Sequence, residues 1–269
     1  MFSKIDIHLG DCFFWLSKVA DNSIDMCYID PPFFTQRDFK QYDDRWLGMD
    51  TYLDYMRVRV EEIHRVLKDT GTIFLHCDWR ASHKLRLLLD KIFGENHFIN
   101  EIIWSWSGPN NSKRCFPRQH NNIFYYSKSS NYFFKQPRIK HKRGLHFTGF
   151  MFKGKRTLSS YDIEQMEAKG KKLESWWVDI LSCSRLHKER LGYPTQKPEK
   201  LLERIIECST NEGDVVLDCF GGSGTTAAVA KKLNRKFITG DVSPEAVGII
   251  EKRIATIEKE ARNGKSKAV

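Results

Sequence analysis

The residues Asp30-Pro31-Pro32-Phe33 combine a carboxylate, a rigid turn and an aromatic ring directly after the apolar segment 24–29. Two prolines fix φ and remove two backbone donors, so a strand over 24–29 has to stop here. Asp30 precedes a proline and is held in extended geometry at the strand's carboxyl end, where ligands bind in open α/β sheets. Carboxylate and carbonyl oxygens only accept hydrogen bonds, which suits a ligand that donates them, such as an exocyclic amino group. For Asp-Pro taken alone, an ordinary strand-ending turn is the alternative.

A second candidate site is the Gly-rich stretch 218–226, which lies between a predicted strand and a predicted helix. Its glycines let the backbone turn tightly and approach a ligand closely, and the following helix amino terminus favours an anion. The next predicted strand ends at Asp241, where an acidic residue typically binds the hydroxyls of an adenosine ribose. Because Gly222-x-Gly224-x-x-Ala227 also fits the dinucleotide fingerprint, this stretch alone leaves NAD and other adenosine ligands open.

Strands and helices that alternate along the chain must position these two sites. Helical spacing of apolar residues predicts helices over 51–68 and 81–93, and further ones over 12–20, 159–169, 198–208, 225–233 and 244–259. Apolar runs predict strands over 4–9, 24–29, 72–76, 100–106, 122–127, 215–219 and 236–240. This alternation predicts an α/β fold, a mostly parallel sheet with helices on both faces. Residues 34–50 have no clear period, and we expect a mobile loop there.

Composition places the chain among packed globular proteins, with 41% hydrophobic and 13% aromatic residues. The sequence contains no apolar run near the ~20 residues of a membrane span and no apolar core of a signal peptide. Seven cysteines without a Cys-x-x-Cys pair predict reduced, buried thiols in a cytoplasmic protein and no metal site.

The basic charge of the chain is concentrated in one segment. Residues 113–190 carry 18 Lys and Arg against 6 Asp and Glu, a balance of +12, whereas the whole chain carries +10. Aromatic residues are interleaved with these charges, which is typical of a nucleic-acid surface, although a solvated basic face is the alternative. Periodicity also fails over 135–190, so this range is predicted to be an insertion into the main sheet.

Five motifs in order resemble the permuted (β-type) DNA amino-methyltransferases, which use S-adenosylmethionine to methylate adenine N6 or cytosine N4. The likeness covers nearly the whole chain except 135–190. In that family a catalytic motif upstream of the cofactor loop marks the permuted order. The motifs are Gly10-Asp11, Asp30-Pro31-Pro32-Phe33, Gly71–Asp78 with the later strand 122–127, Tyr193–Pro198, and Phe220–Gly224.

The resemblance implies a Rossmann-like domain in two halves, 1–134 (catalytic) and 191–262 (cofactor-binding). Between them lies a target-recognition insertion, 135–190, and a frayed tail follows at 263–269. It implies the catalytic residues Asp30, Pro31, Pro32 and Phe33. It further implies a set of residues around S-adenosyl-L-methionine, namely Asp11, Asp30, Thr195, Lys197, Asp218, Phe220, Gly221, Gly222, Ser223, Gly224, Thr225 and Asp241.

Within that set, residues 220–225 would wrap the methionine and ribose, and Asp241 would bind the ribose hydroxyls. Asp11 would hold the adenine amino group, and Thr195 and Lys197 the methionine carboxylate region. The family often has Glu in place of Asp241 and His in place of Tyr193. Purely structural roles are the alternatives for Asp11 as a turn residue, Lys197 as a solvated lysine and Phe33 as a core residue.

The chemistry expected at Asp30 is activation of a weakly nucleophilic amino group. The Asp30 carboxylate and the Pro31 carbonyl would draw the amino hydrogens out of the ring plane, and the nitrogen would attack the sulfonium methyl directly. Since that nitrogen cannot be reached inside a duplex, the base must be flipped out, with Phe33 stacked on it. No cysteine lies in a Pro-Cys turn, which argues against methylation of cytosine C5.

In the family, cytosine-N4 enzymes more often carry Ser before the Pro-Pro turn, so the resemblance makes adenine N6 the preferred target for a chain with Asp30. Cytosine N4 is the alternative because the same geometry serves either base. An NAD-dependent oxidoreductase would explain the Gly-rich stretch but not Asp30-Pro-Pro-Phe or the basic segment. A non-catalytic nucleic-acid-binding protein would leave both ligand-like turns unexplained, and RNA-directed relatives tend to carry Trp in place of Phe33. The expected partner is double-stranded DNA. The family also suggests a homodimer and a cognate restriction endonuclease, neither of which a residue of this sequence demands.

Overall fold

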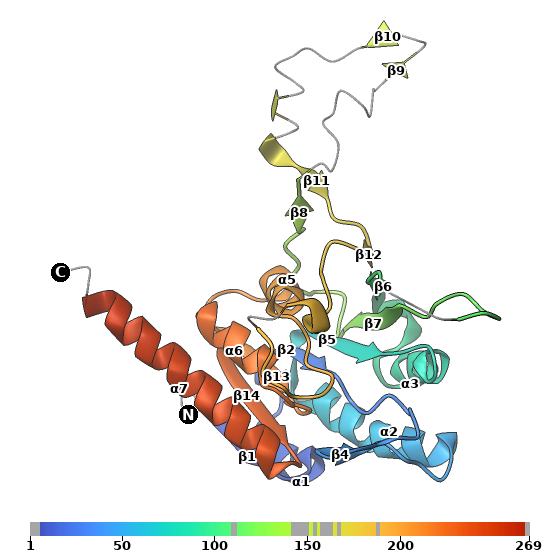
Figure 1. Cartoon of the computed structure of the whole chain (residues 1–269), viewed down its shortest axis with the longest axis vertical. Coiled ribbons are helices and arrows are strands. Elements are labelled where there is room, and N and C mark those ends of the chain that lie inside the picture. The colour runs from blue at the N-terminus through green and yellow to red at the C-terminus, as the bar shows by residue number, and fades with distance from the viewer. Residues whose placement is uncertain are drawn as a thin grey trace.

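The computed structural model of the chain describes residues 6–108, 112–140, 151–152, 155–156, 164–165, 168–186 and 189–266. Its centre is an eight-stranded sheet in the order β1-β14-β13-β2-β5-β7-β6-β12 (Figure 1). Neighbouring strands are parallel except for the two pairs that β7 forms with β5 and β6. The strands are β1 (Asp6–Leu9), β2 (Ile24–Ile29), β5 (Leu67–Cys77), β6 (Phe98–Ser105), β7 (His120–Ser127), β12 (Trp176–Trp177), β13 (Val215–Asp218) and β14 (Lys236–Asp241).

Helices cover both faces of this sheet, and each face has its own apolar core. One core joins α1, α2 and α3 to the sheet and includes Trp15, Met56 and Leu85. The other joins α5, α6 and α7 and includes Leu201 and Ile250. The helices are α1 (Cys12–Leu16), α2 (Met49–Val66), α3 (Ser82–Phe93), α5 (Glu199–Ser209), α6 (Thr225–Lys232) and α7 (Pro244–Ser266), with the 3-10 turns η1 (Glu95–His97) and η2 (Cys183–Arg185). The predicted α/β class with helices on both faces is confirmed.

The order of the strands confirms the permuted arrangement. β13 and β14 come late in the chain but lie inside the sheet, where β14 pairs with β1 and β13 pairs with β2. From β13 the chain passes through α6 to β14 on one side, and from β2 it passes through α2 to β5 on the other. The gap between the carboxyl ends of β13 and β2 is therefore the switch point of the sheet, the usual place for a ligand in such folds.

Described residues near the end of the range 135–190 contact the edge of the main sheet. Within it, β12 pairs in parallel with the edge strand β6, and Trp177 is buried. Before β12, β8 (Arg138–Ile139) pairs with β11 (Lys171–Lys172), and the two rise away from the sheet near α5 (Figure 1). A second short pair consists of β9 (Met151–Phe152) and β10 (Lys155–Arg156). Most of the helix predicted over 159–169 lies outside the described residues.

Other differences from the predicted elements are small and have local causes. The range 34–50, expected to be a mobile loop, contains the hairpin of β3 (Asp38–Phe39) and β4 (Tyr42–Asp43). The strand predicted to begin at residue 72 is β5, which begins at Leu67 directly after α2. It starts earlier because Leu67 already pairs with Ile24 of β2. Pro198 precedes α5 as its N-cap rather than opening it. α7 extends through Ser266, past the expected fraying point at residue 263, since residues 258–262 are mostly good helix formers.

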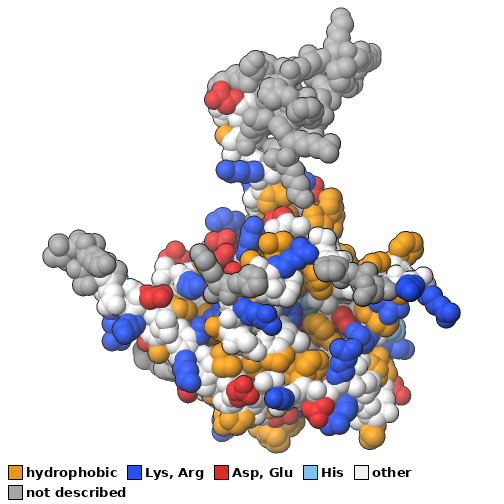
Figure 2. Space-filling view, viewed as in Figure 1, with side chains coloured by type: hydrophobic (Ala, Val, Ile, Leu, Met, Phe, Trp, Pro, Cys, Tyr) orange, Lys and Arg blue, Asp and Glu red, His pale blue; other side chains and the backbone are white. Residues whose placement is uncertain are grey.

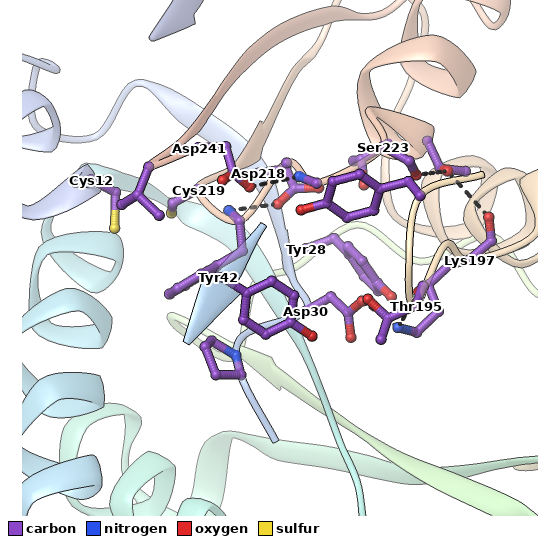
Figure 3. Close-up of a pocket in the computed structure, with 18 of the residues that line it drawn as sticks. Cys12, Tyr28, Asp30, Tyr42, Thr195, Lys197, Asp218, Cys219, Ser223 and Asp241 are labelled. Atoms are coloured by element: carbon purple, nitrogen blue, oxygen red, sulfur yellow. Dashed lines mark hydrogen bonds and ion pairs between the residues drawn. The ribbon is translucent and has the colours of Figure 1, made fainter. Parts of the chain in front are cut away.

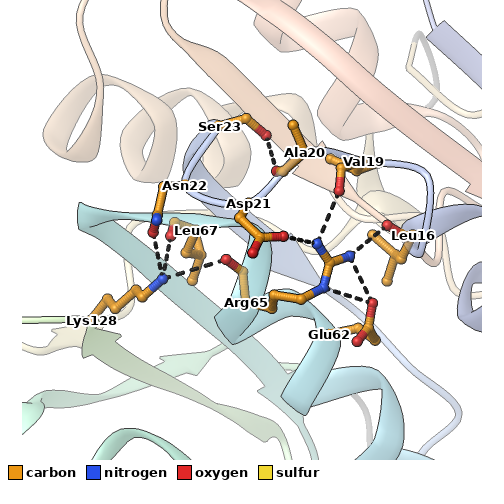
Figure 4. A network of polar contacts seen from close by, with 10 residues as sticks. All are labelled: Leu16, Val19, Ala20, Asp21, Asn22, Ser23, Glu62, Arg65, Leu67 and Lys128. Carbon is orange, nitrogen blue, oxygen red and sulfur yellow. Dashed lines mark hydrogen bonds and ion pairs between the residues drawn. The ribbon is translucent and has the colours of Figure 1, made fainter.

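A polar network fixes the end of α2 against the start of β2 (Figure 4). The Arg65 guanidinium donates to the carbonyls of Leu16 and Val19 and pairs with Asp21 and Glu62. Lys128, after β7, donates to Leu67 O at 2.7 Å and to Asn22 Oδ1 at 2.8 Å. The network lies where β2 and β5 begin and β7 ends, at the opposite end of these strands from the switch point. No helix in the described part of the chain is long and apolar enough to cross a membrane.

Candidate active site

One pocket at the switch point brings together most of the predicted site residues (Figure 3). It encloses about 1040 Å³, including the part that is open to solvent. Twelve of the predicted residues line it: Asp11, Asp30, Pro32, Thr195, Lys197, Asp218, Phe220, Gly221, Gly222, Ser223, Thr225 and Asp241. The carboxyl ends of β2, β13 and β14 converge here, because parallel strands end on the same edge of a sheet.

Three predicted residues do not line the pocket. Pro31 is buried behind the turn. Gly224 caps α6 in the left-handed region, with φ +72°. Phe33 lies beside His76, with ring centroids 5.7 Å apart and planes 30° apart. A β-carbon on Gly224 would lie 2.9 Å from Ile250 Cγ1, so this glycine shapes the loop rather than contacting a ligand.

At the turn after β2, Asp30 is paired with Lys197 and has 16% of its side chain exposed. The lysine contacts Oδ2, whereas Oδ1 is buried and has no hydrogen-bond partner among the described residues. Burial raises the pKa of Asp30, and the charge of Lys197 opposes that rise. Tyr52, from α2, donates its hydroxyl to Pro32 O at 2.8 Å and so fixes the second proline. The turn thus offers one oriented, unsatisfied acceptor to a donor in the pocket.

Lys197 lines the pocket and also pairs with Asp30, a contact that the sequence did not predict. Only 8% of the residue is exposed, which excludes a solvated lysine. Its Nζ also donates to Thr195 O at 3.1 Å and lies 5.1 Å from the Phe33 ring centroid. The charge predicted to hold a methionine carboxylate is therefore paired with Asp30 in this structure. Thr195 lines the pocket, but its hydroxyl donates to Pro194 O at 2.6 Å.

The Gly-rich stretch is held against the ends of β13 and β14 by its own backbone. Asp218 Oδ1 accepts from Phe220 N at 3.0 Å, and Asp241 Oδ2 accepts from Gly222 N at 2.8 Å. Asp241 also accepts from Ser243 N. Burial raises the pKa of Asp218 to about 7 and raises that of Asp241 as well. These two carboxylates have no cationic partner among the described residues, so this end of the pocket is acidic.

Asp11 both caps a helix and lines the pocket. Its Oδ1 caps α1 by accepting from Phe13 N at 2.9 Å, and its Oδ2 pairs with Arg59 of α2. The Arg59 guanidinium in turn lies 3.3 Å from the centre of the Tyr55 ring. Asp11 lines the pocket, but both of its carboxylate oxygens already have partners. A ligand bound by Asp11 would therefore have to share the carboxylate with Phe13 N and Arg59, which join α1 and α2.

Sequence patterns missed several residues that shape the site. Tyr42, Trp46 and Tyr55 line the pocket, and the first two come from the range 34–50 that has no period. Asp44 is fully buried and accepts hydrogen bonds from Phe34 N, Thr35 N, Thr35 Oγ1 and Trp46 Nε1 at 2.6–3.0 Å. The only sequence feature that could have pointed to Asp44 was that this carboxylate lies among aromatic residues.

Nucleophilic thiol chemistry does not fit this pocket. All seven cysteines are free, and only Cys115 is exposed. Cys12 and Cys219 line the pocket, but burial and their mutual hydrogen bond raise the pKa of the Cys12 thiol far above its usual value. No cluster of metal-ligating side chains occurs among residues for which the structure gives positions.

Comparison with known proteins decides the family. The family profile of the N6/N4 DNA methylases matches residues 24–252. The chain belongs to the N6/N4 DNA methylase family. The methylase is 31% identical over 240 residues to the type II methyltransferase M.HpaI of Haemophilus parainfluenzae, covering 89% of this chain and 70% of the relative. It is 30% identical over 266 residues to the type II methyltransferase M2.DpnII of Streptococcus pneumoniae, covering 94% and 90%.

Solved structures confirm the fold of the methylase. The complex of M1.HpyAVI with SAM aligns with a TM-score of 0.62 at 22% identity, covering 93% of this chain and 98% of that one. The PvuII DNA methyltransferase, which is cytosine-N4-specific, aligns with a TM-score of 0.66 at 18% identity, covering 92% and 85%. Family membership makes the NAD-dependent oxidoreductase and the non-catalytic binding protein wrong as alternatives.

Proposed function

We propose that this methylase transfers a methyl group from S-adenosyl-L-methionine to the N6 amino group of a flipped-out adenine in duplex DNA. The observation that carries the proposal is that Asp30 and the Gly-rich stretch line one pocket. Figure 3 shows Asp30 beside Lys197 and Thr195, with Asp218 and Asp241 farther along the same pocket. A methyl donor and an acceptor amine held there would be close enough to react in line, which supplies a large part of the rate of such transfers.

The pocket residues fit S-adenosyl-L-methionine better than a dinucleotide. Five aspartates line the pocket against one lysine, and Asp218 and Asp241 accept only backbone or hydroxyl hydrogen bonds. Unpaired carboxylates favour a ligand that carries positive charge and oppose a pyrophosphate. Gly222 has φ +51°, and a β-carbon there would lie 3.2 Å from the Tyr193 ring, so the loop leaves space only for a bare backbone. Asp241 would accept from the ribose hydroxyls.

When bound, the cofactor supplies an electrophilic methyl group on a sulfonium. Asp30 Oδ1 would accept one hydrogen of the target amine, and the Pro31 carbonyl would accept the other. Both acceptors stabilise the nitrogen most as it becomes tetrahedral and positive, so their effect grows toward the transition state. Lys197 orients the carboxylate through Oδ2 and opposes the rise that burial causes in the pKa of Asp30. Phe33, flanked by neutral His76, would provide one wall for the flipped base.

The target base is tested by incubating the protein with labelled S-adenosyl-L-methionine and mixed duplex DNA, followed by nucleoside analysis. We expect N6-methyladenine. N4-methylcytosine would replace the adenine assignment, and the likeness to the cytosine-N4-specific PvuII enzyme makes this the second candidate. Absence of methyl transfer to any DNA would overturn the proposed activity.

The wider role follows from the same relatives. Both M.HpaI and M2.DpnII are type II methyltransferases, which supports a place for this chain in a restriction-modification system beside a cognate endonuclease. Protection of DNA from a co-encoded nuclease would test this role. The homodimer suggested by the family resemblance stays a prediction, and sedimentation would test it. Residues 135–190 remain our proposal for target recognition, with Lys and Arg on phosphates and a few side chains on base edges.

A further inference from the structure

A second hollow lies beside the catalytic turn, where β5 ends and β7 begins. It encloses about 620 Å³, including the part open to solvent. Its walls include Asp78, Trp79 and Arg80, which follow β5, together with Trp106, Arg118 and His120 from the connection between β6 and β7. Asp78 ends the motif Gly71–Asp78, and Arg118 belongs to the basic segment 113–190, but the proposed mechanism does not use this hollow.

The hollow lies next to the proposed active site, at the same end of the sheet. The strand order β14-β13-β2-β5-β7 puts the cofactor residues on β13 and β14, the catalytic turn on β2, and the hollow on β5 and β7. Because β5 pairs directly with β2, with Leu75 opposite Ile29, the end of β5 that borders the hollow lies beside the turn at Asp30. His76, two residues before Asp78, stacks with Phe33. A DNA strand whose flipped base stacked on Phe33 would therefore run beside this hollow.

The hollow holds a positive charge that is oriented but not neutralised. The Arg118 guanidinium lies 3.8 Å from the centre of the Trp79 ring, and that of Arg80 lies 4.8 Å from it. Arg80 is paired with Asp78, which neutralises it. Arg118 pairs with no carboxylate in the described part of the chain, and its side chain is exposed. An indole face fixes the plane of a guanidinium while leaving its N–H groups free to donate at the edge.

We propose that this hollow binds a backbone phosphate of the DNA strand that carries the target base, with Arg118 as the donor and Trp79 as its support. The inference rests on the proposed function, because it takes duplex DNA as the substrate. A planar guanidinium matches two phosphate oxygens, which is the geometry that Trp79 imposes here. The segment between β6 and β7 extends at the right of Figure 1, and Lys and Arg side chains gather at the same edge in Figure 2. This contact lies outside β8–β12 and would hold the strand next to the flipped nucleotide.

The test compares Arg118→Ala with Arg118→Lys and with Arg57→Ala in the full chain. Arg57 is an exposed arginine on α2 that pairs with Glu61, so its removal changes the net charge equally on another part of the surface. Duplex affinity is measured at several salt concentrations, and cofactor affinity is measured in parallel. We expect Arg118→Ala to weaken duplex binding about tenfold and to reduce the slope of log K against log salt by about 0.9.

The remaining variants separate charge from geometry. Arg118→Lys should keep the salt slope but bind DNA more weakly than the wild type, because it retains the charge and loses the planar fork. Arg57→Ala and the cofactor affinity of every variant should be unchanged. Wild-type salt dependence in Arg118→Ala, with methyl transfer intact, would overturn this inference and leave the proposed function standing. An equal loss in Arg57→Ala would also overturn it, because net charge alone would then explain the effect. If the wild type methylates no DNA, the proposed function itself fails.

Discussion

Lys197 and Asp30 lie 167 residues apart in the chain and form an ion pair in the pocket, with 9% and 16% of their side chains exposed. The pair joins the turn after β2 to the segment before α5, and so connects the two halves of the permuted sheet. The lysine occupies Oδ2 and leaves Oδ1 as the free acceptor. We infer that Lys197 is a positioning residue that acts on the target amine through Asp30.

The substitution Lys197→Met should move the acid limb of the pH-rate profile to higher pH. Burial raises the pKa of Asp30, and Lys197 lowers it, so the pKa rises further when the charge is removed. Because the carboxylate is lost as pH falls through its pKa, the variant should lose activity at a higher pH than the wild type does. Single-turnover methyl transfer measured between pH 5 and pH 9 gives the two profiles.

A matched control is Lys200→Met, three residues further on. Lys200 is largely exposed, and its Nζ is 4.0 Å from Asp179, so its loss should leave the profile unchanged. An unshifted profile in Lys197→Met would show that the lysine does not act through Asp30. A loss of cofactor affinity with a normal profile would restore the contact with the methionine carboxylate that the sequence suggested.

The ion pair also shows how far the sequence could predict this site. An apolar run located the strand over 24–29, and helical spacing of apolar residues located α2. The motifs identified Asp30 and Lys197 separately, but a pairing between residues 167 positions apart has no periodic signal, so the sequence did not predict their ion pair. The same reason applies to Asp44, whose four donors come from an aperiodic segment.

Asp30→Asn should abolish most methyl transfer while leaving cofactor and DNA binding detectable. The amide has nearly the same volume but no charge, so it cannot both pair with Lys197 and accept strongly from the amine. Loss of one oriented group at a developing charge typically costs a factor of about 10² to 10³ in rate. Rapid-quench transfer assays with saturating cofactor measure the effect, and Asp54→Asn on the exposed face of α2 is the control. Retained turnover would remove Asp30 from catalysis.

Gly224→Ala should destabilise the protein and weaken cofactor binding. Gly224 has φ +72°, which costs an L-residue about 1–2 kcal/mol, and the new β-carbon would approach Ile250 within 2.9–3.3 Å. Gly248→Ala, in the interior of α7, meets no atom within 4 Å and should stabilise by about 0.5–1 kcal/mol. Thermal unfolding and cofactor titration of both variants measure the contrast. If the two variants were equally stable, the idea that residue 224 requires a glycine at the start of α6 would be contradicted.

Asp44→Asn should slow methyl transfer because it loosens the chain after the Pro-Pro turn. Its carboxylate accepts from two backbone N–H groups at Phe34 and Thr35 and from two side chains. An amide nitrogen placed against these donors leaves at least one buried donor unpaired, at a cost of about 1–3 kcal/mol. Asp38→Asn, at an exposed pair with Arg45 outside the pocket, is the control. Urea unfolding and transfer rates are measured together, and a stable variant with wild-type rate would contradict the role.

Asp218 should make the stability of the protein fall as pH rises from about 4 to about 7. Burial holds its pKa at about 7 in the folded chain, against an ordinary value of 3.8. Over this window the folded chain keeps a proton that the unfolded chain has lost, so the stabilising contribution is complete below pH 4 and disappears through pH 7. Asp218→Asn removes this titration, and urea unfolding of both proteins from pH 4 to pH 8 isolates it.

The same carboxyl should couple cofactor binding to pH. A ligand with net positive charge favours the ionised form of Asp218, so binding should release protons below pH 7 and its affinity should increase with pH over the same window. Titration calorimetry in buffers of different ionisation enthalpy counts these protons. Parallel unfolding curves for the wild type and Asp218→Asn, together with proton-neutral binding, would show that Asp218 is already ionised in the pocket.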